Sequence, residues 1–150
     1  MGVKHGKEIG WAESGSKGFE ADYKDGNPDG QLIQYFPNGK KNYVDSYKEG
    51  ERHGPSIDWN EKGQPKIERN YKDDKLHSEI WYHDNGKPKY EWHYKDGKKD
   101  GPCFEWDKNG KKSVVGNYKN GKMHGEFKYY RENGKLRRRA TYSEGRRVYR

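Results

Sequence analysis

Six side chains that could bind a metal or transfer a proton recur at a nearly constant interval. Steps of 23 or 24 residues separate them: His5, Asp29, His53, His77, Asp100 and His124. Zinc needs its nitrogen ligands about 2.0–2.1 Å away, whereas equivalent positions of a repeating hairpin lie two strands apart, roughly 10 Å. Neighbouring members therefore cannot share one ion. We expect polar turn residues that bond nearby backbone, and we predict no metal site and no cofactor.

Other residue types associated with catalysis also lack a suitable pattern. Cys103 is the only cysteine, so an intrachain disulfide is impossible, and no histidine recurs beside it as a partner. The carboxylates of Asp58 and Glu68 fit solvated cross-strand groups. The glycines lack the G-x-x-x-x-G-K-[ST] order of a phosphate-binding loop. We therefore expect no catalytic residues, no enzyme activity and no small-molecule substrate.

Anion binding is the chemistry that the C-terminal residues favour. Residues 135–150 carry seven basic side chains and one acid, Glu144, which accounts for most of the formal net charge of +8. The basic residues are Lys135, Arg137, Arg138, Arg139, Arg146, Arg147 and Arg150. Interleaved Tyr142 and Tyr149 could stack on bases, and each cation near an anionic lipid surface contributes about 1 kcal/mol. The alternative is a solvated basic edge that keeps the last strand from aggregating.

The elements that position these residues repeat with the same period. Tyrosine recurs every 23 or 24 residues, at Tyr23, Tyr47, Tyr71, Tyr94, Tyr118 and Tyr142. Glycines in turn-like contexts follow at alternating steps of about 11 and 13 residues, a spacing typical of all-β proteins. A fixed period in this range indicates a repeat architecture. The sequence predicts an all-β, antiparallel β-meander of about twelve strands.

We expect residues 1–150 to form a single repeat domain. A partial repeat covers residues 1–22, and a basic strand covers residues 142–150. The full repeats cover residues 23–46, 47–70, 71–93, 94–117 and 118–141. Aromatic residues reach 15%, which favours a folded chain over a disordered one. No apolar run approaches membrane-spanning length, and the lone cysteine is compatible with the reducing cytoplasm, where we expect the protein.

Alternation along the strands predicts which residues share a face. A three-residue loop, Pro37-Asn38-Gly39, would place Ile33 opposite Tyr43. The same offset pairs Ile9 with Phe19, Ile57 with Ile67, Ile80 with Tyr90, and Phe104 with Val114. A column of Trp11, Tyr35, Trp59, Tyr82, Trp106 and Tyr130 would join this face. We therefore expect one aromatic face and one polar face, and no helix to cover the aromatic one.

Exposed aromatic residues are the candidate anchors for a partner, because Trp, Tyr and Arg dominate binding hot spots. The candidates are Trp11, Tyr35, Trp59, Trp81, Tyr82, Trp106, Phe127, Tyr129 and Tyr130. The last repeat differs from the others. Lys128 and Arg138 occupy its apolar pair positions, and Phe127 and Tyr129 fall on the opposite face. Such a terminal repeat is either a cap on the stack or a binding surface.

The recurring motif resembles the MORN repeat (membrane occupation and recognition nexus). It reads YKDGNPDG…YFPNGK, YKEGERHG…WNEKGQ, YKDDKLHS…YHDNGK, YKDGKKDG…WDKNGK and YKNGKMHG…YRENGK. It looks most like the bacterial variant of the YwqK-type antitoxin family. The third copy departs most, with Asp74 and Ser78 in its glycine positions and one residue fewer.

This resemblance implies a single-layer twisted meander that binds other molecules and has no catalytic residues. The function it favours is an antitoxin or immunity-type protein that neutralises a protein partner, possessing no enzyme activity of its own. Two alternatives stay open: an anionic-surface binder of phospholipid or nucleic acid through the C-terminal arginines, and a self-assembling scaffold.

Overall fold

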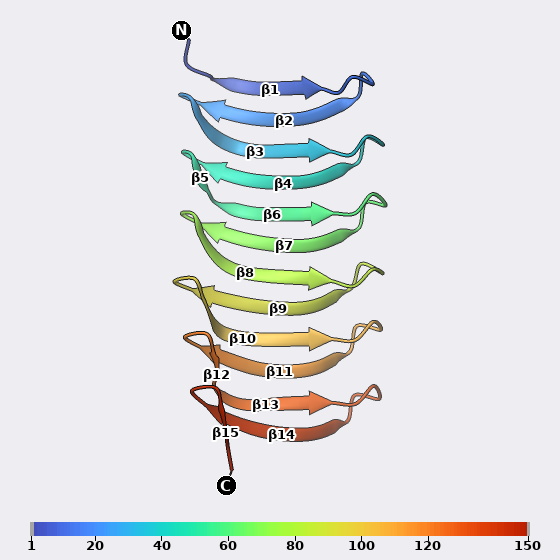
Figure 1. Ribbon diagram of the computed structural model, residues 1–150, viewed down its shortest axis with the longest axis vertical. Coiled ribbons are helices and arrows are strands. Elements are labelled where there is room, and N and C mark those ends of the chain that lie inside the picture. Colours follow the sequence, from blue (N-terminus) through green and yellow to red (C-terminus); the bar gives the residue numbers. More distant parts are fainter. Residues whose placement is uncertain (1, 150) are drawn as a thin grey trace. The chain divides into compact units, whose positions relative to one another are not determined.

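The computed structural model describes residues 2–149 and divides into two compact units, Met1–Lys75 and Leu76–Arg150. Every regular element among the described residues is a β-strand. Neighbouring strands run antiparallel, as Figure 1 shows. The predicted all-β antiparallel meander is therefore confirmed. No helix in residues 2–149 is long and apolar enough to cross a membrane.

The first unit is a meander in chain order. Its strands are β1 (Gly6–Trp11), β2 (Lys17–Lys24), β3 (Asn27–Tyr35), β4 (Lys41–Lys48), β5 (Glu51–Arg52), β6 (Gly54–Trp59) and β7 (Pro65–Lys72). The hydrogen-bonded order is β1-β2-β3-β4-β6-β7, and the two-residue β5 also pairs with β4. His53 separates β5 from β6, and β6 begins at Gly54, which has φ +99°.

The second unit repeats this plan. Its strands are β8 (Lys75–Tyr82), which begins at the unit boundary, β9 (Pro88–Lys95), β10 (Lys98–Trp106), β11 (Lys112–Lys119), β12 (Lys122–Met123), β13 (Gly125–Tyr130), β14 (Leu136–Ser143) and β15 (Arg146–Val148). β12 pairs with β11, and β15 pairs with β14. The fifteen strands of residues 2–149 exceed the predicted twelve or so because β5, β12 and β15 are short separate strands.

The hairpin loop is as predicted, but the register beyond it is not. The Phe36 N–H donates to the Lys40 carbonyl (2.8 Å), which closes the expected three-residue loop with Gly39 at φ +82°. The register then shifts by one residue, so that Ile33 pairs with Val44 rather than with Tyr43. A β-bulge at this place supplies the extra residue.

The same shift occurs in the other predicted hairpins, so all five predicted pairs are wrong. The observed pairs are Ile9 with Glu20, Ile33 with Val44, Ile57 with Glu68, Ile80 with Glu91, and Phe104 with Val115. Because side chains alternate along a strand, a one-residue shift moves every side chain of the second strand to the other face.

Aromatic residues consequently lie on both faces of each unit, and the expectation of one aromatic and one polar face is wrong. We call the side that holds the recurring tyrosines the tyrosine face. These are Tyr23, Tyr47 and Tyr71 in the first unit and Tyr94, Tyr118 and Tyr142 in the second. The other side, the reverse face, holds the column Trp11, Tyr35, Trp59 in the first unit and Tyr82, Trp106, Tyr130 in the second.

The core is thin, and in the first unit it is divided between the two faces. There Ile33 and Val44 are buried on the reverse face and Ala21 on the tyrosine face. In the second unit Cys103, Phe127 and Ala140 are buried on the tyrosine face. With so little buried volume, cross-strand pairs of about 0.2–1 kcal/mol each and the continuous backbone ladders must carry much of the stability.

The Asn and Lys of the turn motif connect successive repeats. Asn85 Nδ2 donates to the carbonyl of Lys108 (2.7 Å), and Lys87 Nζ donates to the carbonyl of Asn109 (3.1 Å). One repeat further on, Lys111 Nζ reaches the carbonyl of Glu132 (3.0 Å). The recurring N-G-K is thus explained by structure, because its polar atoms satisfy backbone carbonyls of the next turn.

Candidate functional surfaces

At His5, His53 and Asp100 the recurring side chain contacts a neighbouring turn, as predicted, whereas the buried Nδ1 of His124 has no hydrogen-bond partner among the described residues. His5 Nδ1 accepts the N–H of Asp25 (3.5 Å), and the Asp100 carboxylate accepts the N–H of Asn120 (3.1 Å). His53 Nδ1 lies 3.2 Å from the Asp73 carboxylate. Each contact joins one repeat to the turn of the next. Across residues 2–149, no three His, Cys, Asp or Glu side chains gather as a metal site would require.

The predicted aromatic anchors do not form one surface. Trp11, Tyr35 and Trp59 lie on the reverse face of the first unit, and Trp11 is 64% exposed. Tyr82, Trp106 and Tyr130 lie on the reverse face of the second unit. Trp81, Phe127 and Tyr129 lie instead on its tyrosine face. Phe127 is only 2% exposed, so it is a core residue and no anchor.

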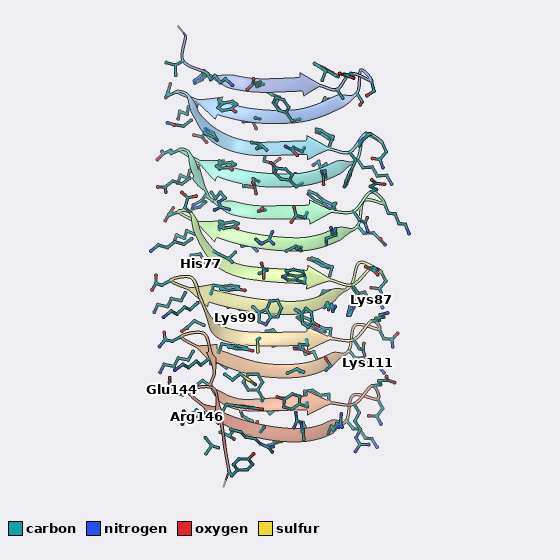
Figure 2. The ribbon with its side chains drawn as sticks, viewed as in Figure 1. His77, Lys87, Lys99, Lys111, Glu144 and Arg146 are labelled. Atoms are coloured by element: carbon teal, nitrogen blue, oxygen red, sulfur yellow. The ribbon has the colours of Figure 1, made fainter. Side chains whose placement is uncertain are left out.

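The tyrosine face of the second unit carries rings and cations in close contact. Tyr90 and Trp92 stack with their centroids 5.1 Å apart, and Trp81 stands directly across from Tyr90. Lys99 Nζ lies 3.7 Å from the Trp92 ring centroid and 5.4 Å from that of Tyr118. Figure 2 labels Lys99 between the strands that carry these rings. Such cation–π contacts contribute about 0.5–1 kcal/mol at exposed sites.

The same surface continues toward β14. The Arg138 guanidinium lies 4.1 Å from the Tyr129 ring centroid. A hollow of about 490 Å³ here is lined by Glu105, Val114, Tyr129 and Arg138, among others. Burial, with a smaller effect of the hydrogen bond to Tyr142, raises the pKa of Tyr129 to about 12. Burial also raises the pKa of Glu105. We call this set, Trp81, Tyr90, Trp92, Lys99, Tyr118, Tyr129 and Arg138, the aromatic–cation surface.

Sequence reasoning missed the members Tyr90, Trp92, Lys99 and Tyr118 as a site. They lie in β9, β10 and β11, and the incorrect register assigned Tyr90 to the same face as Ile80. The observed shift places it beside Trp81 instead. The signal that could have drawn attention to this surface is the concentration of Trp81 and Trp92 within a single hairpin.

The C-terminal basic residues fall on two strands and a turn. Arg137, Arg138 and Arg139 are exposed in β14, and Arg146 and Arg147 are exposed in β15. Lys135 lies in the preceding turn, and Arg150 lies outside the described residues. Figure 2 labels Arg146 beside Glu144 at this end of the chain. The predicted basic cluster is therefore an exposed edge of the second unit.

Comparison with known families agrees with the repeat geometry. The model of the MORN repeat variant matches residues 28–49, 52–73, 78–96, 99–120 and 123–144, which is more than half of the chain. A search of curated proteins found no match. Each matched segment runs from the first strand of a hairpin into the turn that follows its second strand. The chain therefore belongs to the MORN repeat variant family, whose repeats generally bind proteins or membranes.

Proposed function

We propose that this chain is a non-enzymatic protein-binding module that neutralises a protein partner by covering its active surface. The aromatic–cation surface carries this proposal. Resemblance of the repeats to the YwqK-type variant supports an antitoxin or immunity role, and we place that role in the cytoplasm.

The surface has the composition of a binding hot spot. Trp, Tyr and Arg are the residues most enriched where binding energy concentrates, and all three occur here together. Trp81 is 39% exposed although it is a large apolar side chain. Exposed apolar groups that gather on one surface usually mark an interaction site. Lys99 and Arg138 add positive charge, which favours a partner with acidic side chains around an apolar centre.

Substitution at the centre of the surface tests the proposal. A tagged chain is used to capture its partner from native lysate with nuclease present, and the identified partner is then purified for titration. Trp81→Ala and Lys99→Glu should each weaken binding by about tenfold or more while leaving the far-ultraviolet spectrum and the melting temperature nearly unchanged.

Trp11→Ala is the matched control, because it removes an exposed tryptophan from the reverse face of the first unit. It should leave the affinity unchanged. If the Trp81→Ala, Lys99→Glu and Trp11→Ala variants bind the partner with the same affinity, the aromatic–cation surface is not the binding site. Capture of nucleic acid or lipid alone, released by salt, would refute the protein-binding function.

A further inference from the structure

The outer edge of β14 lacks a strand over most of its length. β14 pairs with β13 from Tyr142 back to Leu136, whereas β15 pairs only with Thr141, Tyr142 and Ser143. On the side away from β13, no strand of the described residues pairs with Leu136–Ala140. This open stretch matches the usual strand length of about five residues. In the preceding repeat, the corresponding edge of β11 is covered by β13.

Alternate residues of this stretch direct their backbone groups to the open side. In the preceding repeat the His124 N–H donates to the Asn117 carbonyl (2.9 Å), and Val115 of the same strand pairs with Lys128. Hydrogen-bonding direction alternates along a strand. The equivalents one repeat later are Thr141 and Arg139, and Thr141 pairs with Val148 of β15. Arg139 therefore presents its N–H and C=O outward.

Positive charge accompanies the open backbone. Arg137, Arg138 and Arg139 are consecutive and exposed, so a strand added here would meet a guanidinium on both faces. Arg138 stacks on Tyr129 on the tyrosine face. On the reverse face, the Arg139 guanidinium lies 3.6 Å from the carboxylate of Glu126 in the neighbouring strand β13. Arg147 on β15 adds a further charge at one end of the stretch.

We propose that the outer edge of β14 binds an acidic, extended segment of a partner protein by β-strand addition. The added strand pairs with β14 in antiparallel orientation, in the same way that β13 pairs with β11 one repeat earlier. Its acidic side chains stand opposite the three arginines, at the cross-strand distance of about 4.5–5.5 Å between Cβ atoms. Beside the edge, a hollow of about 240 Å³ between Arg139 and Tyr149 offers room for one of its side chains.

A polypeptide fits this edge better than the other polyanions. Phospholipid headgroups and nucleic-acid phosphates would be attracted by the arginines alone, and neither contains the alternating amide donors and acceptors of a strand. The edge offers both features along the same residues. This binding mode shares Arg138 with the aromatic–cation surface, but it depends on the open backbone of β14. The comparison of peptides with and without backbone donors therefore tests it separately from the proposed function.

The test uses the full chain and a synthetic peptide of about ten residues, with three consecutive glutamates at its centre and valines on either side. Because side chains alternate along a strand, these glutamates reach the arginines on both faces. A second peptide has the same sequence but carries N-methyl groups on alternate amides, which remove ladder donors and leave every charge in place. The first peptide should bind at least about tenfold more tightly, because it forms several backbone hydrogen bonds that the second cannot form. Hydrogen exchange of the Arg137 and Arg139 amides should slow when the first peptide is bound.

Two variants of the protein complete the test. Arg139→Pro removes an outward N–H at an edge, where proline is tolerated. Arg137→Glu with Arg139→Glu reverses the charge of the edge and leaves Arg138 of the aromatic–cation surface in place. Both should weaken peptide binding by about tenfold or more. Lys66→Glu, an exposed lysine of the first unit, is the matched charge control and should have no effect.

Three outcomes would overturn the proposal. The two peptides could bind equally, which would show that charge alone is sensed. The Arg137 and Arg139 amides could exchange at the same rate with and without the peptide. Lastly, vesicles containing phosphatidylserine or single-stranded DNA could bind in an arginine-dependent manner while the peptide does not, which would assign the edge to an anionic surface.

Discussion

Phe127→Ala is the substitution that most directly tests whether the tyrosine face of the second unit is a packed core. The Phe127 ring makes edge-on contacts with Tyr142, at 5.2 Å between centroids, and with Tyr118, at 6.0 Å. It also covers Gly116 on the neighbouring strand, where an added Cβ would lie 2.2 Å from the ring. The side chain is thus enclosed by rings on its own face and by a glycine beside it.

The expected loss follows from this enclosure. Truncating a buried phenylalanine to alanine costs about 3–5 kcal/mol, a range that includes the ring–ring contacts of about 0.5–1.5 kcal/mol each. We expect the lower end, about 3 kcal/mol, because a single-layer sheet lets water into the space left behind. For a unit of this size that corresponds to a decrease of roughly 12–24 °C in melting temperature.

Phe19→Ala is the matched control. Phe19 covers Gly10 in the first unit by the same cross-strand arrangement, but it is 36% exposed. Its truncation leaves no enclosed cavity and should cost about 1–2 kcal/mol. Urea unfolding, combined with native-state hydrogen exchange resolved by segment, assigns each loss to its own unit.

A double-mutant cycle sharpens the test. Gly116→Ala alone should destabilise the second unit by about 1–3 kcal/mol, because its methyl group collides with the Phe127 ring. In the Phe127→Ala background the same methyl group enters vacated space, so the two losses should couple by about 1–3 kcal/mol. Additive losses, or a Phe127→Ala variant that is as stable as the parent, would refute the packing described for this face.

Three further predictions concern single side chains. Hydrogen bonds from Lys17 and Tyr35 lower the pKa of Glu20 to about 2, from 4.5; the carboxylate therefore stabilises the first unit above about pH 4.5 and loses that contribution as the pH falls toward about 2. In the Glu20→Gln variant, the urea concentration at the unfolding midpoint should fall less steeply between pH 4.5 and about pH 2 than in the parent chain. The same steepness in both chains would contradict this. Burial, assisted by Glu105, raises the pKa of Cys103 to about 11, so a thiol reagent at pH 8 should label the chain only as it unfolds, and rapid labelling of the folded chain would argue against it. Asn85→Ala should lower the free energy of unfolding by about 1 kcal/mol, because the side chain loses one hydrogen bond to the next turn and one within its own turn. Asn133→Ala should cost less, because that side chain bonds within its own turn. Equal losses of stability in thermal unfolding would contradict the role of Asn85 in joining repeats.

The sequence by itself determined the repeat and its elements. The tyrosine period, the glycine steps and the N-G-K turns predicted antiparallel hairpins of 24 residues, and the structure has them. These features are local, because a turn residue with positive φ selects glycine or a small polar residue wherever it occurs. The exposed basic edge could also be predicted from the sequence, because arginine side chains are rarely buried and three of them are consecutive.

Only the tertiary structure decided which residues share a face. Alternation fixes the facing within one strand, but a bulge after each loop adds a residue that has no compositional signature. That single residue moved Tyr43 away from Ile33 and brought Tyr90 to Trp81. It thereby assembled the aromatic–cation surface, which depends on contacts between strands rather than on the order of residues along them.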